Sequence, residues 1–474
     1  MKFGDKLPSW EPGGFQEKLA ETAEKLSSLE NPKIFCHIDA DGLTSGSIIF
    51  YTIEKMGKTP QIFPIRQLDA ETILLVPKEE AFVLVDFGSG QKNLLSDPKG
   101  PGVIIDHHEP IEGGLSGKIS HLNAAEQGFS GSAEISASGL AYLVSERLIG
   151  ETSLIPLAIT GAVGDIQAKR GLTGLNREIL KKGIAAKEVV ATKGLPFFGR
   201  ETRELAVFLS YATDPFLPGL SGSIAGCSEF LRKLGINPLG TYNRLPSEEL
   251  ARLVTGIHER AIAVGLEPWQ ISNLVTETYT FPKEMELTEP RDATEFSTLL
   301  NSCGRNEWAN VGIKICLGDR GDAYLKAKEL LAEHRENIKN GLQELEAKPV
   351  RLFGKNIQIF QSEKVKPTII GIVIGIALGG RLVDPSRVFI GTAAQDPGNI
   401  KVSARTTAQL VRRGANLSEA IRTAAKEVGG LGGGHNIAAG ATIPKSKLEE
   451  FAKKFDGEIS KQLDREQPKK LFSP

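Results

Sequence analysis

The sequence has little cysteine and no long apolar run. Its four cysteines form no C-x-x-C pair and stand apart, at Cys36, Cys227, Cys303 and Cys316. Neither a disulfide framework nor a structural zinc site is therefore expected. The most apolar window, residues 369–380, falls well short of the roughly twenty residues that span a bilayer. We interpret this window as buried core.

The start of the chain also lacks the apolar stretch of a signal peptide. Residues 1–15 are interrupted by Pro8, Glu11 and Pro12, which does not fit the apolar segment of an export signal. We therefore expect a cytoplasmic protein that has no membrane association.

An excess of charge of one sign is missing as well. Lysine and arginine total 57 and aspartate and glutamate total 58, which gives a formal net charge of −1. This balance argues against a histone-like basic surface, but nucleic-acid binding depends on where positive charges lie and not on their sum. With 40% hydrophobic and 24% charged residues, the composition is that of a globular protein.

The length and the patterning predict several domains. At roughly 150 residues per domain, the 474 residues correspond to about three domains, or to two with a large insertion. Residues 34–36, 81–85 and 103–105 are short continuous apolar runs separated by longer helix-like stretches. Such runs are typical of parallel strands buried on both faces. We therefore expect an α/β fold with a parallel sheet wrapped by helices.

The pattern changes along the rest of the chain. A mostly helical stretch indicates an inserted or accessory region, and residues 322–346 have the apolar spacing of one long amphipathic helix. A second, smaller α/β domain follows this helix. The predicted organisation is an N-terminal extension at 1–32, a catalytic α/β domain at 33–200, a helical insertion at 201–295, a connecting segment with the long helix at 296–348, the smaller domain at 349–460, and a tail at 461–474.

Acidic residues closely follow the predicted strands of the first domain. They are Asp39 and Asp41 after the first strand, Asp86 after the second, Asp106 of an Asp-His-His triplet after the third, and Asp165 after a run of small residues. Each aspartate taken alone is explained equally well as a turn residue or a helix cap. Because the carboxyl ends of parallel strands line a common crevice, the ordered set predicts that these aspartate side chains lie close together.

Five clustered carboxylates require cations to compensate their charge. Aspartate oxygens with one or two imidazoles suit Mn²⁺ or Mg²⁺ better than Zn²⁺. Two such ions activate a water molecule and stabilise the leaving oxygen when a phosphoester is hydrolysed. The residues therefore predict a two-metal phosphoesterase, with Mn²⁺ favoured and Mg²⁺ as the alternative.

The ordered set resembles a known family. Asp39-x-Asp41-Gly42, Asp86, Asp106-His107-His108 and Asp165 stand in the order of the four motifs of the DHH phosphoesterase superfamily. The resemblance covers about residues 33–200 and 296–445, and no counterpart of residues 201–295 is found in the bacterial members. It implies that Asp39, Asp41, Asp86, His107 and Asp165 are metal ligands. Asp106 and His108 would order the site or contact phosphate. His37 stands two residues before Asp39, closer than the family's usual motif histidine, and we assign it to the catalytic group from its position.

The carboxy-terminal part resembles the DHH-associated domain. Ser403 and Arg405 are alternate residues of a predicted strand, so they share a face and could grip a phosphate. Gly433, Gly434 and His435 offer backbone amides and a ring donor to a phosphate oxygen, and Arg305 could hold a terminal phosphate. The resemblance implies that Ser403, Arg405, Gly433, Gly434 and His435 bind substrate, and we add Arg305 to this group from its position after Gly304.

Within the superfamily, the length, the segment Asn301-Ser302-Cys303-Gly304-Arg305 and the sequence Asp39-Ala40-Asp41-Gly42 resemble RecJ-type single-strand exonucleases, and especially the archaeal GINS-associated branch. This resemblance implies 5′-to-3′ hydrolysis of single-stranded DNA, with RNA as an alternative, in a cleft between two domains. It also implies a role in DNA replication or repair, with GINS and the replicative helicase as partners. Two other functions stay open: a phosphodiesterase for oligoribonucleotides or cyclic dinucleotides, and a non-catalytic replisome scaffold.

Overall fold

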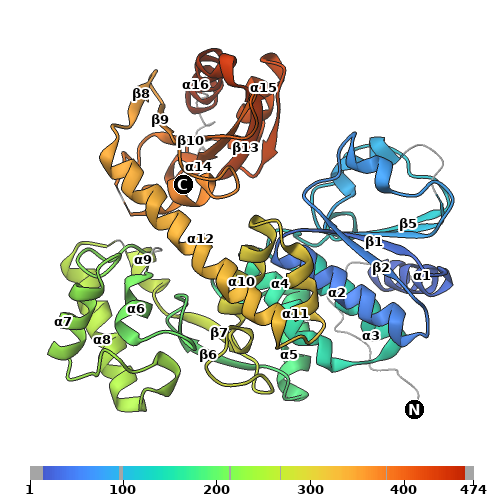
Figure 1. Cartoon of the computed structure of the whole chain (residues 1–474), viewed down its shortest axis with the longest axis horizontal. Helices are drawn as coiled ribbons and strands as arrows, with labels where there is room; N and C mark the ends of the chain where they lie inside the picture. Colours follow the sequence, from blue (N-terminus) through green and yellow to red (C-terminus); the bar gives the residue numbers. More distant parts are fainter. Residues whose placement is uncertain (1–13, 96–99, 213–214, 267, 381, 465–474) are drawn as a thin grey trace, which may run out of the picture. The chain divides into compact units, whose positions relative to one another are not determined.

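The computed structural model describes residues 14–95, 100–212, 215–266, 268–380 and 382–464 (Figure 1). They form two compact units. The first contains the described residues up to Ala212 together with Leu217–Leu331, and the second contains Ala332 onwards with a short segment at Phe216. Among the described helices, none combines the length and the apolar character that crossing a bilayer requires.

A five-stranded parallel sheet lies at the centre of the first unit, as the apolar runs predicted. Its strand order is β2-β1-β3-β4-β5, with every neighbouring pair parallel. The strands are β1 (Lys33–His37), β2 (Gln61–Ile65), β3 (Phe82–Val85), β4 (Gly102–Asp106) and β5 (Ile119–Asn123). The chain leaves β1 toward β2 and then returns to β3 on the other side of β1, so the loops after β1 and β3 diverge and leave a crevice.

Alternate residues of the strands enter two different cores. Ile34, Cys36 and Val85 pack against the helices on one face, and Phe35 and Leu84 pack on the other face. The helical face is covered by α1 (Phe15–Ser28), α2 (Ala40–Lys55) and α3 (Ala137–Ile149) (Figure 1). The other face packs against the short 3-10 helices η1 (Thr72–Leu75) and η2 (Ser89–Leu95).

Four more helices complete this layer: α4 (Ile155–Gly164), α5 (Gly174–Ala185), α10 (Ala293–Arg305) and α11 (Ala309–Cys316). Helix α10 packs against both α2 and α4. Asp39 directly precedes α2, and Asp165 directly follows α4. Helix α10 therefore supports two predicted site residues from a distant part of the sequence.

Residues 190–280 contain two strands beside the mostly helical region that was predicted from residue 201. A two-stranded antiparallel sheet of β6 (Val190–Gly194) and β7 (Thr276–Thr280) closes the base of the region. The β-branched threonines of β7 favour a strand, a signal that the helical interpretation overlooked. Between the strands, α6 (Leu205–Ser210), α7 (Ile224–Lys233), α8 (Ser247–Ala263) and α9 (Pro268–Ser272) surround a separate apolar core. Helix α10 begins at Ala293, so the predicted boundary at residue 295 falls inside it.

The second unit is a smaller α/β domain, as expected. Its six-stranded sheet has the order β12-β13-β11-β10-β9-β8. The strands are β8 (Arg351–Phe353), β9 (Ile357–Gln361), β10 (Val388–Ala394), β11 (Asn399–Arg405), β12 (Leu431–Gly434) and β13 (Ala438–Pro444). The predicted long helix is α12 (Asp322–Ala347), which begins in the first unit and ends in the second.

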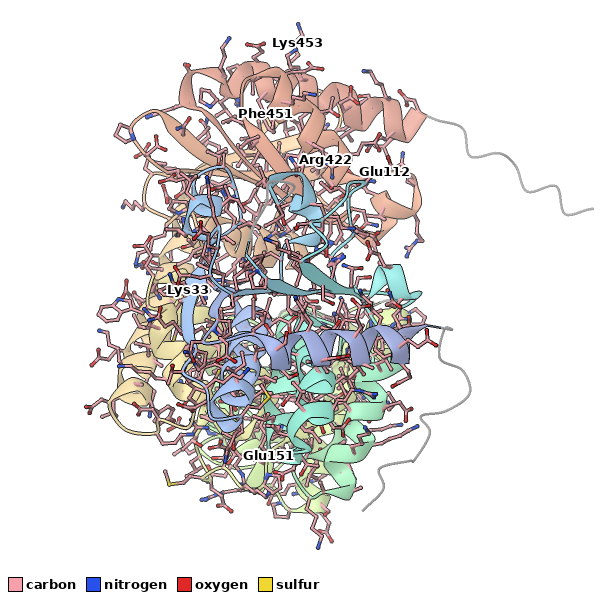
Figure 2. The ribbon with its side chains drawn as sticks, turned by 90° about the vertical axis from the view of Figure 1, so that its right-hand side faces the viewer. Lys33, Glu112, Glu151, Arg422, Phe451 and Lys453 are labelled. Carbon is pink, nitrogen blue, oxygen red and sulfur yellow. The ribbon has the colours of Figure 1, made fainter. Side chains whose placement is uncertain are left out.

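Helices pack on both faces of this sheet. Helices α15 (Leu417–Glu427) and α16 (Leu448–Asp464) cover one face, and the apolar α13 (Ile370–Gly379) packs on β10 and β11 from the other. Along α16, Phe451 points into the unit and Lys453 points away from it (Figure 2). The remaining short helices are η3 (Ala125–Gln127), η4 (Thr152–Leu154), η5 (Tyr242–Arg244), η6 (Glu289–Arg291), α14 (Ala408–Arg412) and η7 (Lys445–Lys447).

Candidate active site

The predicted site residues of the first unit gather at the carboxyl edge of the parallel sheet. Asp39 caps α2, Asp86 follows β3, Asp106 ends β4 and Asp165 caps the end of α4. Their side chains and those of nearby histidines form three overlapping groups, with ligand atoms in each group within 4.8 Å of one another. The groups are Asp86 with His107 and His108, His37 with Asp39 and Asp86, and Asp41 with His107 and Asp165.

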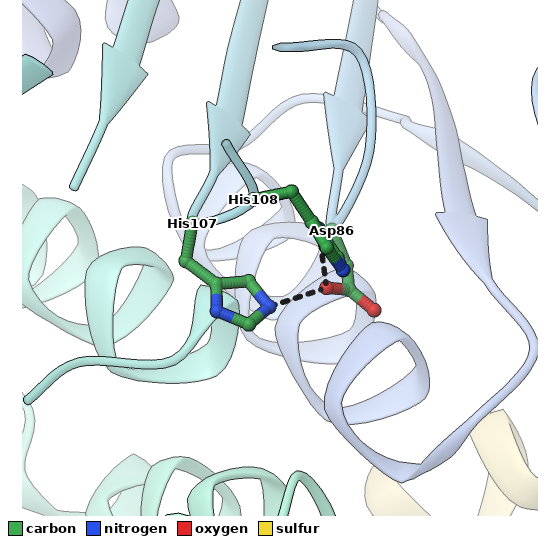
Figure 3. A group of neighbouring side chains, drawn as sticks. All are labelled: Asp86, His107 and His108. Atoms are coloured by element: carbon green, nitrogen blue, oxygen red, sulfur yellow. Dashed lines mark hydrogen bonds and ion pairs between the residues drawn. The ribbon is translucent and has the colours of Figure 1, made fainter. Parts of the chain in front are cut away.

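Asp86 lies at the centre of these groups. Its Oδ1 is 3.2 Å from His107 Nε2, and its Oδ2 is 3.4 Å from His37 Nδ1. Figure 3 shows the His107 and His108 rings, which follow β4, approaching the carboxylate of Asp86, which follows β3. Asp86 has a φ of 67°, a left-handed conformation that non-glycine residues rarely adopt outside functional sites and turns. This turn directs the side chain across the crevice.

The ring orientation of His107 is fixed by a backbone carbonyl. His107 Nδ1 lies 2.5 Å from the carbonyl oxygen of Gly131, and because that oxygen can only accept, Nδ1 carries the proton. The other nitrogen, Nε2, faces Asp86 and, at 3.7 Å, Asp41. A donated Nδ1–H with Nε2 turned to carboxylates is the arrangement of a histidine metal ligand.

Asp106 turns away from the other carboxylates and orders the loop that carries the histidines. Its Oδ1 accepts from the amides of His107 and His108 at 2.8 and 3.1 Å and contacts His108 Nδ1 at 2.8 Å, and its Oδ2 accepts from the Ser89 amide at 2.9 Å. Burial alone would raise the pKa of Asp106, but His108 and these donors hold it well below its usual value. Asp106 is thus an ionised anchor.

His108 lies at the solvent-exposed rim of the site, where 44% of its side chain is exposed. Burial would lower its pKa, but the Asp106 carboxylate raises it to about 9. Asp106 thus favours the charged form of this exposed imidazole.

Asp41 joins the site to the start of α3. Its two oxygens accept from the amides of Ala137 and Ser138 at 2.8 and 3.0 Å. Gly161 of α4 permits this approach, because a Cβ at that position would overlap Asp41 Oδ1.

The electrostatics of the cluster test whether it suits a cation. Burial, followed by the charge of Asp86, raises the pKa of Asp41 to about 7. Burial and the same neighbour also raise the pKa of Asp165 to about 6, although His107 opposes the shift. Carboxylates held together at such a cost in free energy fit a divalent cation, and oxygen with imidazole donors suits Mn²⁺ or Mg²⁺.

Several supporting contacts were not identified from the sequence. Asn301 Oδ1 accepts the Ala40 amide at 3.0 Å, and Gln167 donates to Asp165 Oδ2 and to the Gly131 carbonyl, each at 2.8 Å. The sequence shows only that polar residues stand at these positions. Their partners depend on the docking of α10 and on the turn after α4, which no local pattern reveals.

Arg305 ends α10 and lies close enough to Asp39 for the two charges to interact. Burial lowers the pKa of Arg305, and the Asp39 carboxylate opposes that shift. The structure thus places Arg305 with the carboxylate cluster of the first unit.

In the second unit, Ser403 and Arg405 share one face of β11. Ser403 is level with Gly391 of β10 and Gly440 of β13, and Gly440 is level with Gly433 of β12. Ser403 is thus the one side chain in a row of glycines that runs across four strands. Gly391 lies beneath Ile370 and Ile374 of α13, whereas a Cβ at Gly433 would meet no atom within 4 Å. The accessible part of the row is therefore its β12 end.

Helix α13 contributes a glycine surface beside Arg405. A Cβ at Gly371 would lie 2.7 Å from Arg405 Nη2 and 3.2 Å from Ser403 Oγ. The missing side chain therefore makes room for the guanidinium. Gly434 ends β12 with a φ of 137°, and the following His435 is exposed. The Ser403 hydroxyl and the Arg405 guanidinium thus share a face of β11, and His435 follows β12 of the same sheet.

Comparison with known proteins identifies the family. Residues 33–163 match the DHH family N-terminal domain, residues 197–275 the DHH-CID domain and residues 354–461 the DHHA1 domain. An uncharacterized protein of Methanocaldococcus jannaschii is 34% identical over 442 residues, which cover 91% of this chain and 94% of the relative. The chain belongs to the DHH phosphoesterase superfamily. This DHH protein is accordingly a metal-binding hydrolase that acts on phosphodiesters.

Solved structures show that the DHH protein has a RecJ-like fold. RecJ in complex with Mn²⁺ from Thermus thermophilus matches 96% of this chain with a TM-score of 0.60 and 18% identity. The chain spans 56% of the length of that RecJ. Because 96% is covered, most of residues 201–295 does have a structural counterpart in RecJ, which corrects the expectation of none. CDC45 from Entamoeba histolytica matches 94% of this chain and 98% of its own length with a TM-score of 0.62 and 11% identity.

Proposed function

We propose that this DHH protein is a metal-dependent exonuclease specific for single-stranded nucleic acid, acting 5′ to 3′ on DNA in replication or repair. The observation that supports the proposal is that two groups of residues, one in each unit, have the chemistry to act on phosphate. One is the carboxylate and imidazole cluster, and the other is the glycine row with Ser403 and Arg405. A polymer with repeated phosphates can use both groups, whereas a single phosphodiester needs only the first.

Two divalent ions, with Mn²⁺ favoured, would be held by Asp39, Asp41, Asp86, His107 and Asp165, with His37 beside Asp39 and Asp86. Such ions lower the pKa of water and stabilise the leaving oxygen in phosphoester hydrolysis.

The chain's own residues have separate roles around this reaction. Asp106 holds the loop of His107 and His108 in place through four contacts. His108, at the exposed rim, contacts the phosphate that is cleaved. Ser403, Arg405, Gly433, Gly434 and His435 bind adjoining phosphates, and Arg305, beside Asp39, binds a terminal phosphate.

The test is digestion of single-stranded DNA and RNA in Mn²⁺, with each strand labelled in turn at its 5′ and its 3′ end. We expect mononucleotides or short oligonucleotides released first from the 5′ end of DNA, and little digestion of a duplex. Early release from the 3′ end would overturn the polarity. Cleavage of dinucleotides without loss of long strands would instead establish a small-substrate phosphodiesterase.

We also propose a second role, as a component of the replication machinery that docks to GINS and associates with the replicative helicase. The fold shared with CDC45 over 94% of the chain supports it, and so does the resemblance to archaeal GINS-associated nucleases. Purified GINS at micromolar concentration should co-elute with the full chain in size-exclusion chromatography. Separate elution of the two would remove GINS as a partner.

A further inference from the structure

The residue after Asp165 is an isoleucine in a conformation suited to glycine. Helix α4 ends with three backbone hydrogen bonds: Asp165 N–H to Gly161, Ile166 N–H to Val163 and Gln167 N–H to Ala162, at 2.9, 3.1 and 3.0 Å. This pairing is the Schellman helix cap, whose left-handed residue is most often Gly and sometimes Asn. Here Ile166 occupies that position with a φ of 61°, where a β-branched residue is strained.

Burial does not compensate for this strain. Ile166 is 74% exposed, so its side chain gains little from packing in the folded protein. A residue whose backbone strain is not offset by packing contacts is a candidate for a functional contact. The position agrees, because Ile166 directly follows Asp165, whose carboxylate belongs to the group with Asp41 and His107.

The chemistry of the neighbouring groups indicates what Ile166 contacts. The carboxylates would hold metal ions, and these ions and the polar His108 ring would contact the charged phosphate. None of these groups offers an apolar surface to a base. Proteins that bind single strands without sequence preference contact the flat, apolar faces of the bases. We propose that Ile166 contacts the nucleobase of the nucleotide whose phosphodiester is cleaved. This inference rests on the proposed nucleic-acid substrate.

Three variants separate this contact from a structural role. Ile166→Asn suits the left-handed backbone and removes the apolar surface, whereas Ile166→Leu keeps the apolar surface without β-branching. Lys187→Asn is the matched control, because Lys187 has a φ of 59° and the same cap at the end of α5. The control position is also remote from Ile166. Asn176 of α5 contacts Gln167, the neighbour of Ile166, and Lys187 lies about 16 Å from Asn176 along the axis of α5. We expect both asparagine variants to melt at least as high as the parent protein. A lower melting temperature for Ile166→Asn would show that the side chain stabilises the fold and would remove the premise.

The decisive measurement compares substrates with and without a base at the cleaved position. The parent protein should show a lower KM for a base-containing single strand than for the same strand with an abasic site, and the same difference for a dinucleotide. In Ile166→Asn the KM for base-containing substrates should rise roughly threefold to tenfold and the abasic KM should not change. Ile166→Leu and Lys187→Asn should behave like the parent protein. If the ratio of the abasic KM to the base-containing KM is the same in Ile166→Asn as in the parent protein, Ile166 does not contact the base.

The two substrates distinguish failure of this inference from failure of the proposed function. If the parent protein cleaves dinucleotides but not strands, the exonuclease proposal fails and the dinucleotide ratio still decides the role of Ile166. If the parent protein cleaves both substrates but the ratio does not respond to Ile166→Asn, the exonuclease proposal stands and the base contact fails. If it cleaves neither substrate and binds base-containing and abasic strands equally in Ca²⁺, both proposals fail.

Discussion

His107 and Gly131 are joined by a hydrogen bond of 2.5 Å from the ring Nδ1 to the carbonyl oxygen. A Cβ at Gly131 would overlap the carbonyl oxygen of His107, so the two segments approach as closely as they do only because residue 131 is glycine.

Gly131→Ala should therefore weaken metal binding. Contacts that orient a metal-ligating histidine typically contribute ~10–100-fold in metal affinity, and we expect a loss in that range for Mn²⁺ by isothermal titration calorimetry. Gly114→Ala is the control, because a Cβ there meets no atom within 4 Å. Equal Mn²⁺ affinity for the two variants would contradict the role of Gly131.

Replacement of Asp86 tests the metal assignment. Asp86 belongs to two of the three groups of metal-ligating atoms, so Asp86→Ala should abolish cleavage and leave binding of single strands largely intact. Turnover in Mn²⁺ and strand binding by fluorescence anisotropy provide the two readouts. Glu30→Ala, at a side chain that is 82% exposed, should change neither. Undiminished turnover of Asp86→Ala in Mn²⁺ would falsify the two-metal assignment.

Two glycines of α13 provide a test of the phosphate-binding face. A Cβ at Gly371 would lie 2.7 Å from Arg405 Nη2, whereas a Cβ at Gly375 would lie 3.8 Å from Arg405 Nε. Gly371→Ala should displace the guanidinium and weaken strand binding by roughly threefold to tenfold, with kcat unchanged. Gly375→Ala should retain affinity and increase stability through better helix propensity. If both variants bind strands equally well, Arg405 does not contact the strand.

The stability of the first unit should decrease between about pH 4.5 and pH 8. Burial and the neighbouring Asp292 raise the pKa of Glu295 to about 8 from its ordinary 4.5. In this window the folded state holds a proton that the unfolded state releases, so the stabilisation present below pH 4.5 is lost as the pH rises toward 8. Urea unfolding at several pH values should show this slope. Glu295→Gln should reduce it, and the raised pKa values of Asp41 and Asp165 should account for part of the slope that remains. The Glu30→Gln variant should keep the slope of the parent protein, and a Glu295→Gln variant with that same slope would show that another group titrates.

The sequence allowed the parallel sheet, the long helix and the position of the carboxylates to be predicted. Hydrophobic periodicity and residue composition indicate which segments are strands. Parallel strands then place residues at their carboxyl ends, such as Asp86 and Asp106, at one edge of the sheet, independently of the loop conformations. Loops that bring distant segments together could not be predicted in this way. The contact of Asn301 with Ala40 spans 261 residues, and the strain at Ile166 arises from a helix cap that shows no glycine in the sequence.

The contact between Asn301 and Ala40 indicates how far a fragment of this chain must extend to be catalytically active. A fragment that ends with the N-terminal family domain at residue 163 would lack Asp165, and one that ends before α10 would leave the Ala40 amide without its acceptor next to Asp39 and Asp41. The helical region from residue 197 to 275 thus lies within the catalytic unit and cannot be removed by truncation from the carboxyl end. Catalysis is expected only from a polypeptide that continues through α10.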